Sequence, residues 1–487
     1  MESISGLNNE VLWKYFEDIC RIPRLSRNEG RVVEYLLAFA FEHKLEVKKD
    51  KTGNVLISKP ASPGMENRKK VILQSHMDMV GEKDQGSDHD FYKDPIVPLV
   101  DGEWVTARGT TLGADDGIGM AAQLVILSDP DMVHGPIECL FTVDEESGMT
   151  GAQNLEPGFM TGEILVNLDS EDEGELFIGC AGGMDTIGHF HFKLKKPVDG
   201  AVCYRMSVNG LKGGHSGDKI HKSPGNAIKI LNRFLWNATR KFNLSLSVFN
   251  GGNLRNAIPR EASALFTVPA ASVKNFKLDY QRYEDTLRLE LKHYEPELAF
   301  QLSGAVTPDT ILAPKGQLRL LQAIYACPHG VIAWSPTLVG LVETSTNLAS
   351  IKFIEPDRAI VTTSQRSSVD SAKKDIADRV ASCLAMGGAE IEHSDGYPGW
   401  TPDPDSEILK LTVGIYAGLF GNEPTVRAIH AGLECGLILE KYPSLDMLSF
   451  GPTIRGAHTP SERINIESMN KFWKLLLEVL RRIPEKN

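Results

Sequence analysis

The chain has 487 residues, which is too long for one ordinary hydrophobic core, so we expect two or more domains. Its hydrophobic content of 42% and its charged content of 24% are typical of a soluble globular protein. The formal net charge of −12 argues against a nucleic-acid partner, because such a partner requires a basic face.

The first part of the chain alternates helical and strand-like patterns. Amphipathic spacing predicts helices, and short apolar runs that end in polar residues predict central strands of a covered sheet. In chain order we expect helices over residues 9–22 and 32–43, strands over 55–58 and 71–76, a helix over 117–128, and strands over 137–143 and 163–168. Strands that alternate with helices indicate an α/β sheet covered on both faces.

Beyond about residue 183 the pattern changes to half-exposed strands, in which polar and apolar residues alternate. We expect strands over 189–195, 202–208, 244–249, 262–268 and 351–364, and helices over 225–239, 273–293 and 372–386. This stretch predicts a separate α+β domain over residues 187–397. Residues 1–186 and 398–487, with helices expected over 406–420 and 466–483, would form the first domain.

Five side chains that bind metals readily lie in short polar segments of the first domain. They are His76, Asp115, Glu146, Asp169 and His458. The first four follow or close apolar runs that we interpret as strands, and ligands of α/β folds gather at the carboxyl ends of strands. Two imidazoles and three carboxylates suit borderline-soft divalent ions such as Zn²⁺. Because one carboxylate can bridge, the five residues are a candidate site for two metal ions.

His76 is followed two residues later by Asp78. Alternate side chains of an extended chain share a face, so the Asp78 carboxylate can accept the second imidazole N–H of His76. That bond would fix the tautomer and raise the basicity of the ligand. The alternative is a hydrogen-bonded histidine at a strand end, without a metal.

The glycine-rich run at residues 109–119 contains Asp115 and Asp116. No Gly-Lys-Ser/Thr sequence follows it, and two carboxylates would repel a phosphate, so it is not a phosphate-binding loop. A metal ligand is one interpretation of these acids. The other is that Asp115 or Asp116 caps the helix that begins here.

Three acids in succession, residues 144–146, follow the strand expected at 137–143. Like charges this close raise one another's pKa unless cations neutralise them. A metal ion at Glu146 would do so and would leave Glu145 nearby as a general base. The alternatives are a solvated acidic turn for residues 144–146, surface charge for Asp169 and an ordinary loop histidine for His458.

Together, the order and setting of these segments resemble the M20 family of metallopeptidases, and within it the aminoacyl-histidine dipeptidase branch. The matching motifs are Ser-His76-Met-Asp78, Gly113-Ala-Asp115-Asp116-Gly117, Asp144-Glu145-Glu146-Ser-Gly, Leu-Asp169-Ser-Glu, Gly-Gly-His215-Ser-Gly, Asn256-Ala-Ile-Pro and Gly-Ala-His458-Thr-Pro-Ser-Glu462. They run in the family's order and cover nearly the whole chain. The resemblance implies a zinc-peptidase-like catalytic domain with a mixed sheet covered by helices, and an inserted α+β lid domain.

The resemblance also implies a role for each matching residue of the first domain. The ligands would be Asp115 as the bridge, His76 and Asp169 in one metal site, and Glu146 and His458 in the other. Asp78 would orient His76. Glu145 would be the general base, which takes a proton from the metal-bridging water and delivers it to the leaving amine.

Two matching residues, His215 and Asn256, lie in the inserted domain. The resemblance implies that His215 hydrogen-bonds the developing oxyanion and the substrate carboxylate, and that Asn256 is a second contact to the substrate. Without the resemblance, a turn histidine and a strand-end asparagine would be favoured. A lid that carries catalytic groups implies hinge closure near residues 187 and 397. This lid of roughly 210 residues could supply His215 within one chain or pair with another protomer as a homodimer.

We expect a cytoplasmic protein without membrane association. No apolar stretch approaches the roughly 18 residues of a membrane span, and the N-terminal residues lack the basic start and apolar run of a secretory signal. The seven cysteines are widely spaced and never form Cys-x-x-Cys. They indicate reduced, mostly buried thiols and not a disulfide framework or a thiolate zinc site.

The sequence therefore predicts a metal-dependent dipeptidase that hydrolyses Xaa-His dipeptides, including β-alanyl-histidine. The alternatives are another reaction of the family, such as N-acyl amino acid deacylation or tripeptide cleavage, and a non-catalytic metal-binding scaffold. Asp78 and Glu145 argue against the scaffold, because neither is needed merely to hold metal. The expected cofactors are two divalent ions, with Zn²⁺ most suitable and Mn²⁺ or Co²⁺ as alternatives; the expected partner is a small peptide substrate.

Overall fold

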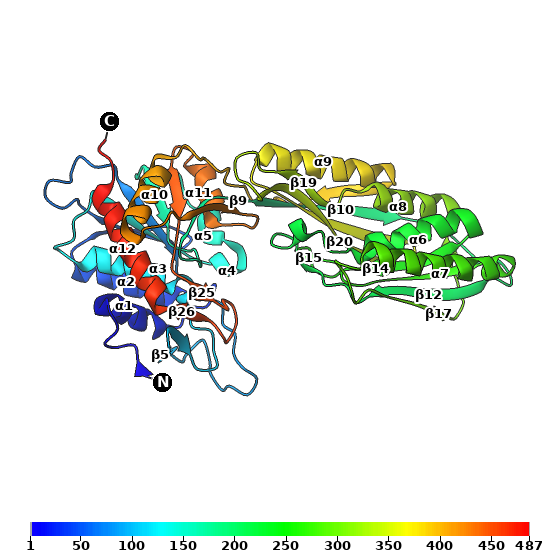
Figure 1. The fold of residues 1–487 in the computed structure, drawn as a ribbon, viewed down its shortest axis with the longest axis horizontal. Helices are drawn as coiled ribbons and strands as arrows, with labels where there is room; N and C mark the ends of the chain where they lie inside the picture. The colour runs from blue at the N-terminus through cyan, green and yellow to red at the C-terminus, as the bar shows by residue number, and fades with distance from the viewer. Residues whose placement is uncertain (1, 487) are drawn as a thin grey trace. The chain divides into compact units, whose positions relative to one another are not determined.

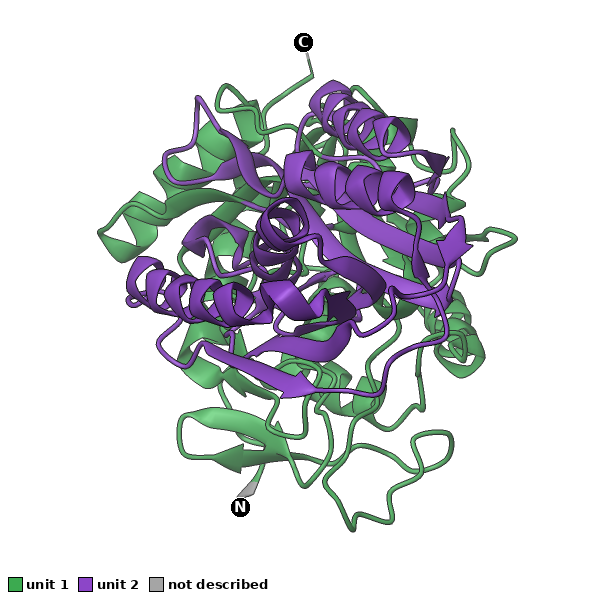
Figure 2. Ribbon diagram, turned by 90° about the vertical axis from the view of Figure 1, so that its right-hand side faces the viewer, with its two compact units in different colours: residues 1–180, 400–428, 433–487 green, residues 181–399, 429–432 purple. Residues whose placement is uncertain are grey.

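The chain forms two compact units in the computed structural model, which describes residues 2–486. The first unit contains residues 1–180, 400–428 and 433–487, and the second contains residues 181–399 and 429–432 (Figure 2). The second unit is therefore inserted into the first, and it also includes four residues from a later part of the chain. No helix within residues 2–486 is both long and apolar enough to cross a membrane.

An eight-stranded sheet forms the centre of the first unit. Its strands, in spatial order, are β2 (Glu46–Lys49), β3 (Val55–Lys59), β7 (Ile137–Thr142), β4 (Val71–His76), β8 (Ile164–Asn167), β24 (Asp446–Ser449), β9 (Glu175–Cys180) and β23 (Thr425–Ile429). The four strands from β7 to β24 are parallel, whereas β2, β3 and β9 pair in antiparallel fashion. Every residue of β4, β7 and β8 is buried, which explains their continuous apolar runs. Their carboxyl ends meet at one edge of the sheet.

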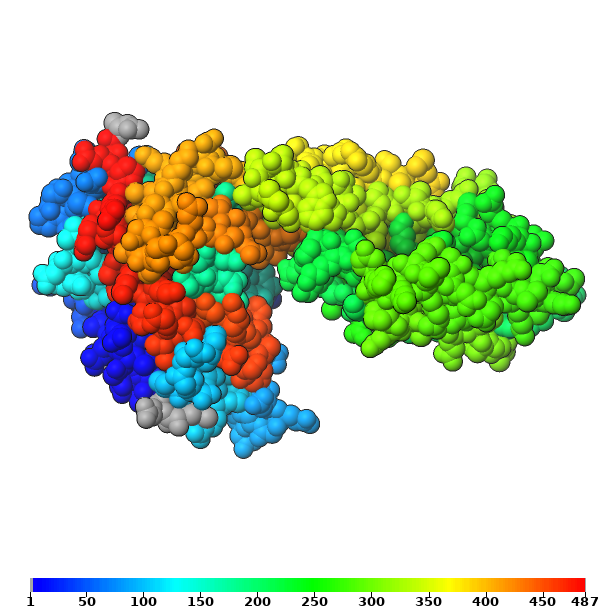
Figure 3. Space-filling model, in the orientation of Figure 1, coloured from blue at the N-terminus to red at the C-terminus, as the bar shows by residue number. Residues whose placement is uncertain are grey.

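Helices cover both faces of this sheet, as strand β4 shows. Ser75 and Gln74 are neighbours in β4, so their side chains point to opposite faces. Ser75 contacts Gln123 in α3 (Ala114–Ser128), and Gln74 contacts Glu434 in α11 (Glu434–Lys441). The other helices of the unit are α1 (Glu10–Cys20), α2 (Gly30–Glu42), α4 (Glu145–Gly148), α5 (Thr150–Gln153), α10 (Glu407–Phe420) and α12 (Ile466–Arg482). Helices α10 and α12 lie side by side at the surface of the unit (Figure 3).

A second, smaller sheet of the first unit has five strands. In spatial order they are β1 (Glu2–Ser3), β5 (Pro98–Asp101), β6 (Trp104–Ala107), β26 (Arg463–Asn465) and β25 (Ile454–Arg455). Strands β25 and β26 are antiparallel neighbours, with Ile454 opposite Ile464. The segment 456–462 that joins them is therefore the loop of a β-hairpin, and it contains His458.

The second unit is built on a nine-stranded sheet in which every pairing is antiparallel (Figure 1). The strands are β17 (Ala299–Gly304), β12 (Val202–Asn209), β16 (Ala262–Val268), β14 (Ser245–Gly251), β20 (Val342–Glu355), β21 (Arg358–Ser367), β10 (Gly182–His191) and β22 (Ala389–His393), with β19 (Gly330–Trp334) beside β20. Two short pairs accompany them: β11 (Leu194–Lys195) with β18 (Ile311–Leu312), and β13 (Gly214–His215) with β15 (Ala257–Ile258).

Four long helices pack on this unit's sheet: α6 (Ala227–Phe242), α7 (Val273–Glu290), α8 (Pro314–Ala326) and α9 (Asp370–Met386). Phe276 of α7 lies at the centre of an aromatic cluster with Tyr204, Phe234, Phe242 and Phe266. All ring centroids in this cluster lie 5.5–6.1 Å from that of Phe276, the spacing of favourable aromatic pairs. This cluster gives the second unit a hydrophobic core of its own.

The predicted α/β fold with a mixed sheet covered by helices is confirmed, but two element predictions are wrong. The strand expected over 351–364 is instead a hairpin of β20 and β21, whose antiparallel pairing places Glu355 opposite Arg358. Pro356 and Asp357 form its turn, which is the usual role of these residues. The strand expected over 189–195 is interrupted, since β10 ends at His191 and β11 begins at Leu194. Helix α8 was not predicted at all.

Candidate metal centre

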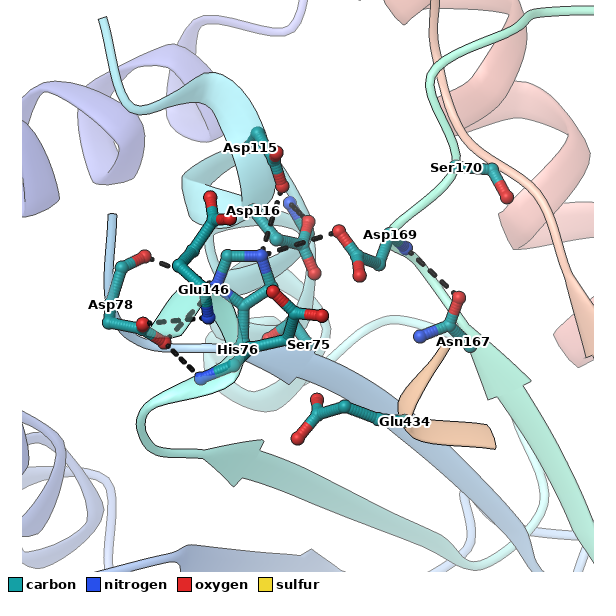
Figure 4. A network of polar contacts seen from close by, with 12 residues as sticks. Ser75, His76, Asp78, Asp115, Asp116, Glu146, Asn167, Asp169, Ser170 and Glu434 are labelled. Carbon is teal, nitrogen blue, oxygen red and sulfur yellow. Dashed lines mark hydrogen bonds and ion pairs between the residues drawn. The ribbon is translucent and has the colours of Figure 1, made fainter. Parts of the chain in front are cut away.

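His76 is the last residue of β4, and the structure buries its side chain to 1% exposure at the carboxyl edge of the sheet. Its Nε2 atom lies 2.9 Å from Oδ1 of Asp115 and 3.4 Å from Oδ1 of Asp169. Asp115 comes from the turn that opens α3, and Asp169 follows β8, the strand beside β4. Figure 4 shows both carboxylates directed toward the imidazole of His76.

His458 comes from the hairpin loop between β25 and β26, and its backbone is left-handed with a φ of 63°. Its Nε2 atom lies 2.9 Å from Oε2 of Glu146 and 3.3 Å from Oδ2 of Asp115. The two oxygens of Asp115 therefore face different histidines, because Oδ1 faces His76 and Oδ2 faces His458.

The five expected ligand residues are thus brought together within the first unit. Their ligand atoms fall into groups in which all atoms lie within 4.8 Å of one another. Two groups contain only expected ligands: His76 with Asp115 and Asp169, and Asp115 with Glu146 and His458. A third group joins His76 and Glu146 with Glu145, which is not one of the five. The donors are imidazole nitrogen and carboxylate oxygen only, which is the set that Zn²⁺, Mn²⁺ and Co²⁺ accept.

Asp78 is fully buried beside His76, and both oxygens of its carboxylate accept hydrogen bonds. Nδ1 of His76 lies 3.2 Å from the backbone carbonyl oxygen of Asp78 and 3.4 Å from its Oδ1. The same Oδ1 accepts a hydrogen bond of 3.0 Å from the backbone amide of Glu145. Its Oδ2 accepts from the backbone amide of Glu146 at 3.2 Å and from the Ser26 hydroxyl at 2.7 Å. Burial alone would raise the pKa of Asp78, but the hydrogen bond and charge of His76 and the bonds from Ser26 and Glu145 lower that pKa to about 2. Asp78 therefore stays an anion under His76.

The imidazoles are strongly perturbed by their acidic neighbours. Burial would lower the pKa of His76, but the charge of Asp169 and hydrogen bonds to Asp115, Asp169 and Asp78 raise it well above its usual value. Hydrogen bonds to Asp115 and Glu146 raise the pKa of His458 to about 11. In both cases the negative charge nearby favours the positively charged form of the imidazole.

The pKa values of the carboxyl groups are perturbed as well. Burial raises the pKa of Asp169 and of Glu145 well above the usual values, and the charge of Asp115 adds to the effect at both. Hydrogen bonds from the two histidines outweigh burial at Asp115 and lower its pKa. Buried carboxylates that outnumber the imidazoles are costly unless cations pair with them, so the donor set fits divalent metal ions.

Asp116 takes the capping role that the sequence left open for either acid. Its Oδ1 accepts a hydrogen bond of 3.1 Å from the amide of Gly119, in the first turn of α3. Burial raises the pKa of Asp116 well above its usual value. Its neighbour Asp115 instead directs its carboxylate toward the histidines. The two adjacent acids therefore have different surroundings.

His215 and Asn256 lie together within the second unit. Strand β13, which contains His215, pairs with β15, and the amide of Ser216 donates to the carbonyl of Asn256 at 2.8 Å. Nδ1 of His215 accepts from the amides of Gly217 and Asp218 at 3.3 and 3.4 Å. In the neutral imidazole the proton then sits on Nε2, which is left as a hydrogen-bond donor.

Arg366, which lies near Asn256 in the second unit, was not predicted from the sequence as a functional residue. Both residues line a pocket of about 370 Å³, together with Asp185, Arg255 and Tyr397. Arg366 is 8% exposed; its Nη1 donates to the Tyr397 hydroxyl at 3.1 Å, and its Nε has no hydrogen-bond partner among the described residues. A buried guanidinium with an unused donor at a pocket is suited to an anionic ligand group. An arginine in an alternating strand gives no such signal in the sequence.

Glu434 is a buried acid that was also not predicted from the sequence. It lies below His76 in Figure 4, at the start of α11. Its Oε2 accepts hydrogen bonds from Nε2 of Gln74 at 2.7 Å and from Oγ1 of Thr142 at 2.6 Å. Burial raises its pKa to about 7. Gln74 shares a face of β4 with His76, so this acid belongs to the same side of the sheet as the candidate centre.

The chain is similar to known proteins in family, sequence and structure. The model of "Peptidase family M20/M25/M40" matches residues 72–482. The cytosol non-specific dipeptidase of Escherichia coli (strain K12) is 44% identical over 486 residues, which cover 100% of each chain.

Two solved structures resemble the chain over nearly its full length. Aminoacylhistidine dipeptidase from Vibrio alginolyticus superposes with a TM-score of 0.95 at 45% identity, covering 100% of this chain and 99% of that one. A tripeptidase from Staphylococcus aureus has a TM-score of 0.57 at 16% identity, covering 98% and 99%. The second likeness concerns the fold alone.

Proposed function

The chain belongs to peptidase family M20/M25/M40, and on that premise we propose that it hydrolyses dipeptides with the help of two divalent metal ions in the candidate centre. The names of the E. coli and V. alginolyticus relatives, which match over the whole chain, support dipeptide hydrolysis. The observation that carries the proposal is the position of Asp115, whose two oxygens each face a different histidine. One carboxylate in that position can bridge two ions.

In the proposed centre, Asp115 is shared, His76 and Asp169 complete one ligand set, and Glu146 and His458 complete the other. Within each set, the distances from the histidine Nε2 atom to the carboxylate oxygens are 2.9–3.4 Å. Nitrogen and oxygen donors without thiolate are best suited to Zn²⁺, with Mn²⁺ or Co²⁺ as alternatives. The buried negative charge of the cluster supports this assignment over a metal-free acidic site.

The chain's own residues would then supply orientation and proton transfer. Bound metal ions would polarise the scissile carbonyl and lower the pKa of water towards neutrality. We propose Glu145 as the general base, whose carboxylate oxygen accepts a proton from the attacking water and passes it to the nitrogen of the leaving amine. Asp78 holds the backbone of Glu145 and lies against Nδ1 of His76, so it would position both. A scaffold that only binds metal would need neither group.

We propose that the second unit is a lid that recognises the ends of the substrate. Arg366 would bind the C-terminal carboxylate through its guanidinium, and Asn256 lines the same pocket. Nε2 of His215 would donate to the developing oxyanion or to the substrate carboxylate. We expected hinges near residues 187 and 397, but residue 187 is paired inside the sheet with Thr362 and Glu392. We therefore place the hinges at the changes of unit, 180–181 and 399–400.

His215 could act within its own chain or in a partner subunit, and we retain the homodimer as a proposal. Mixing a His215→Ala chain with a Glu145→Ala chain distinguishes the two cases. Each variant alone is expected to be inactive. Activity recovered in mixed dimers would show that His215 acts across protomers, whereas no recovery in verified mixed dimers would place it in its own chain.

We propose that Xaa-His dipeptides, including β-alanyl-histidine, are among the substrates. One full-length relative, at 44% identity, is named as a non-specific dipeptidase, and the other, at 45% identity, is named for aminoacylhistidine. The range of substrates that this chain accepts is measured by comparing kcat/KM for Ala-His, β-Ala-His, Ala-Leu, Gly-Gly-Gly and N-acetyl amino acids. Equal turnover of all of them would refute the Xaa-His preference, and preferential turnover of the last two would favour tripeptide cleavage or deacylation.

The proposed function is tested by metal analysis of the purified protein, coupled to hydrolysis of Ala-His before and after chelation. We expect two transition-metal ions per chain, loss of hydrolysis in chelator and recovery when Zn²⁺, Mn²⁺ or Co²⁺ is returned. Less than one ion per chain, with hydrolysis unaffected by chelator, would overturn the proposal. We also propose a cytoplasmic location, in keeping with the name of the E. coli relative.

A further inference from the structure

Glu462 is a buried acid in the hairpin loop that also carries His458. Its side chain is 2% exposed, and its carboxylate reaches a different segment of the first unit. It accepts hydrogen bonds from four consecutive backbone amides, those of Leu112, Gly113, Ala114 and Asp115, at 2.8, 2.9, 2.7 and 3.3 Å. The last of these amides belongs to the residue that faces both histidines.

These four amides belong to the turn that leads into α3, because the backbone of Asp115 and Asp116 is not helical and Asp116 caps the helix that follows through the amide of Gly119. The amides of residues 112–115 lie outside the regular helix, so they need another acceptor. An anion is favoured at such a position, where several N–H groups converge. Glu462 provides this anion from a distant part of the chain, so it joins the turn at residues 112–115 to the loop of His458.

The opposite side of the same turn is held by a buried cation. Arg24 is 1% exposed and donates from Nη2 to the carbonyl of Gly113. Its Nη1 donates to the carbonyls of Met77 at 2.9 Å and Asp78 at 2.7 Å. Gly113 has a φ of 71°, and a Cβ atom there would lie 2.6 Å from Nη2 of Arg24. Only glycine therefore fits between the turn and this guanidinium.

We propose that Glu462 is a positioning residue for the candidate metal centre. By locking residues 112–115 to the hairpin loop, it fixes Asp115 within reach of His458, whose Nε2 lies 3.3 Å from Oδ2 of Asp115. Arg24 ties the same turn to the segment that follows His76. The inference rests on the proposed metal centre. Glu462 would contribute to the affinity for metal indirectly, by holding the backbone amides of the turn that carries Asp115.

A purely structural role is the competing explanation, and Glu138 provides the matched control. Glu138 is also 2% exposed, and its Oε2 accepts from the amides of Thr161 at 2.8 Å and Gly162 at 3.1 Å. It lies near the beginning of β7, whereas the candidate centre lies at the carboxyl ends of the strands. Substitution of either acid by glutamine removes a charge and puts an N–H₂ group against backbone donors.

The experiment compares Glu462→Gln with Glu138→Gln in the full chain. Metal-free samples are titrated with Zn²⁺ by calorimetry, and their melting temperatures and kcat values are measured. We expect both variants to melt below the wild type. Only Glu462→Gln should bind Zn²⁺ about 10–100-fold more weakly, the range typical of groups that orient metal ligands, with kcat recovering as Zn²⁺ is raised. A folded Glu462→Gln protein that binds Zn²⁺ with wild-type affinity would overturn the inference.

Two further measurements cover a variant that fails to fold. Glu462→Asp keeps the charge on a shorter arm, and it is expected to lose part of the Zn²⁺ affinity; unchanged affinity would contradict the role. In the metal-free wild type, the amides of residues 112–115 should exchange slowly with deuterium, and exchange as fast as in exposed loops would also overturn it. A wild type that binds no Zn²⁺ would instead refute the proposed function and, with it, this inference.

Discussion

The carboxylate of Asp78 accepts a hydrogen bond of 3.0 Å from the backbone amide of Glu145. Asp78 follows β4 and Glu145 follows β7, and these two strands are parallel neighbours. One buried acid therefore connects the segment of His76 to the proposed general base. A change at Asp78 should affect metal binding and turnover together.

We predict that Asp78→Asn lowers both the affinity for Zn²⁺ and kcat by about 10–100-fold, because an amide cannot accept all the hydrogen bonds that the carboxylate accepts. Zinc titration and steady-state kinetics on Ala-His measure the two effects. Ser26→Ala removes one hydrogen bond of 2.7 Å to Asp78 and serves as the milder control. Wild-type affinity and kcat in Asp78→Asn would contradict the prediction.

We predict that Glu145→Ala keeps both metal ions but lowers kcat by about 10²–10⁴-fold, the usual contribution of a general base. Metal analysis and kcat on the same sample separate binding from chemistry. Glu146→Ala is the contrasting variant, because it removes the carboxylate that lies 2.9 Å from His458 and should lose metal. Near-normal turnover in Glu145→Ala would rule out its role as base.

We predict that Arg366→Met raises KM for dipeptides by roughly 10–100-fold, the effect of losing one hydrogen bond between charged groups. The wild type should prefer a dipeptide to the same dipeptide with an amidated C-terminus, and the variant should lose that preference. Tyr397→Phe, which removes only the hydroxyl partner of Arg366, is the control. An unchanged preference in Arg366→Met would exclude carboxylate binding at this pocket.

Stability should fall with acid partly because of His430, which is 8% exposed in the second unit. Burial and the charge of Arg366 lower the pKa of His430 to about 3, and the charge of His221 also lowers it. A hydrogen bond with the backbone of Val342 and the charge of Asp218 raise this pKa, but they do not outweigh burial. A depressed folded-state pKa stabilises the protein above about pH 6.5, and this stability is lost as pH falls towards 3.

Between pH 6.5 and 5 the expected loss from His430 is about 2 kcal/mol. His430→Gln should therefore lose less stability than the wild type over this range, as measured by urea unfolding of the chelated protein at both pH values. Equal slopes in the wild type and in His430→Gln would show that His430 does not carry this dependence.

The central strands and the acids at their ends could be predicted because their signals are local. A buried parallel strand requires an unbroken apolar run, and the polar residue that ends it lies at the edge of the sheet, as His76 does. The hairpin of β20 and β21 was predicted as a single strand because apolar and β-branched residues continue on both sides of its turn. In that case the Pro356–Asp357 pair was the informative signal.

The supports of the candidate site could not be predicted in the same way. Glu462 and Arg24 bind backbone amides and carbonyls of distant segments, and every residue type has those groups. Nothing in the spacing of a sequence shows which turn such a side chain will reach. For the same reason Arg366 and Glu434 became recognisable only from their burial and from the oxygen or nitrogen atoms left without partners.

The assignment of residues 429–432 to the second unit has a consequence for dissecting the protein. The chain passes from one unit to the other at four places, 180–181, 399–400, 428–429 and 432–433, so neither unit is a continuous stretch of polypeptide. A fragment with residues 181–399 deleted would retain all five proposed ligands, but His430 would lose its partner Ser345, whose hydroxyl lies 2.7 Å from Nε2. Engineering an autonomous first unit would therefore require redesign of this short segment as well as a linker across the deletion.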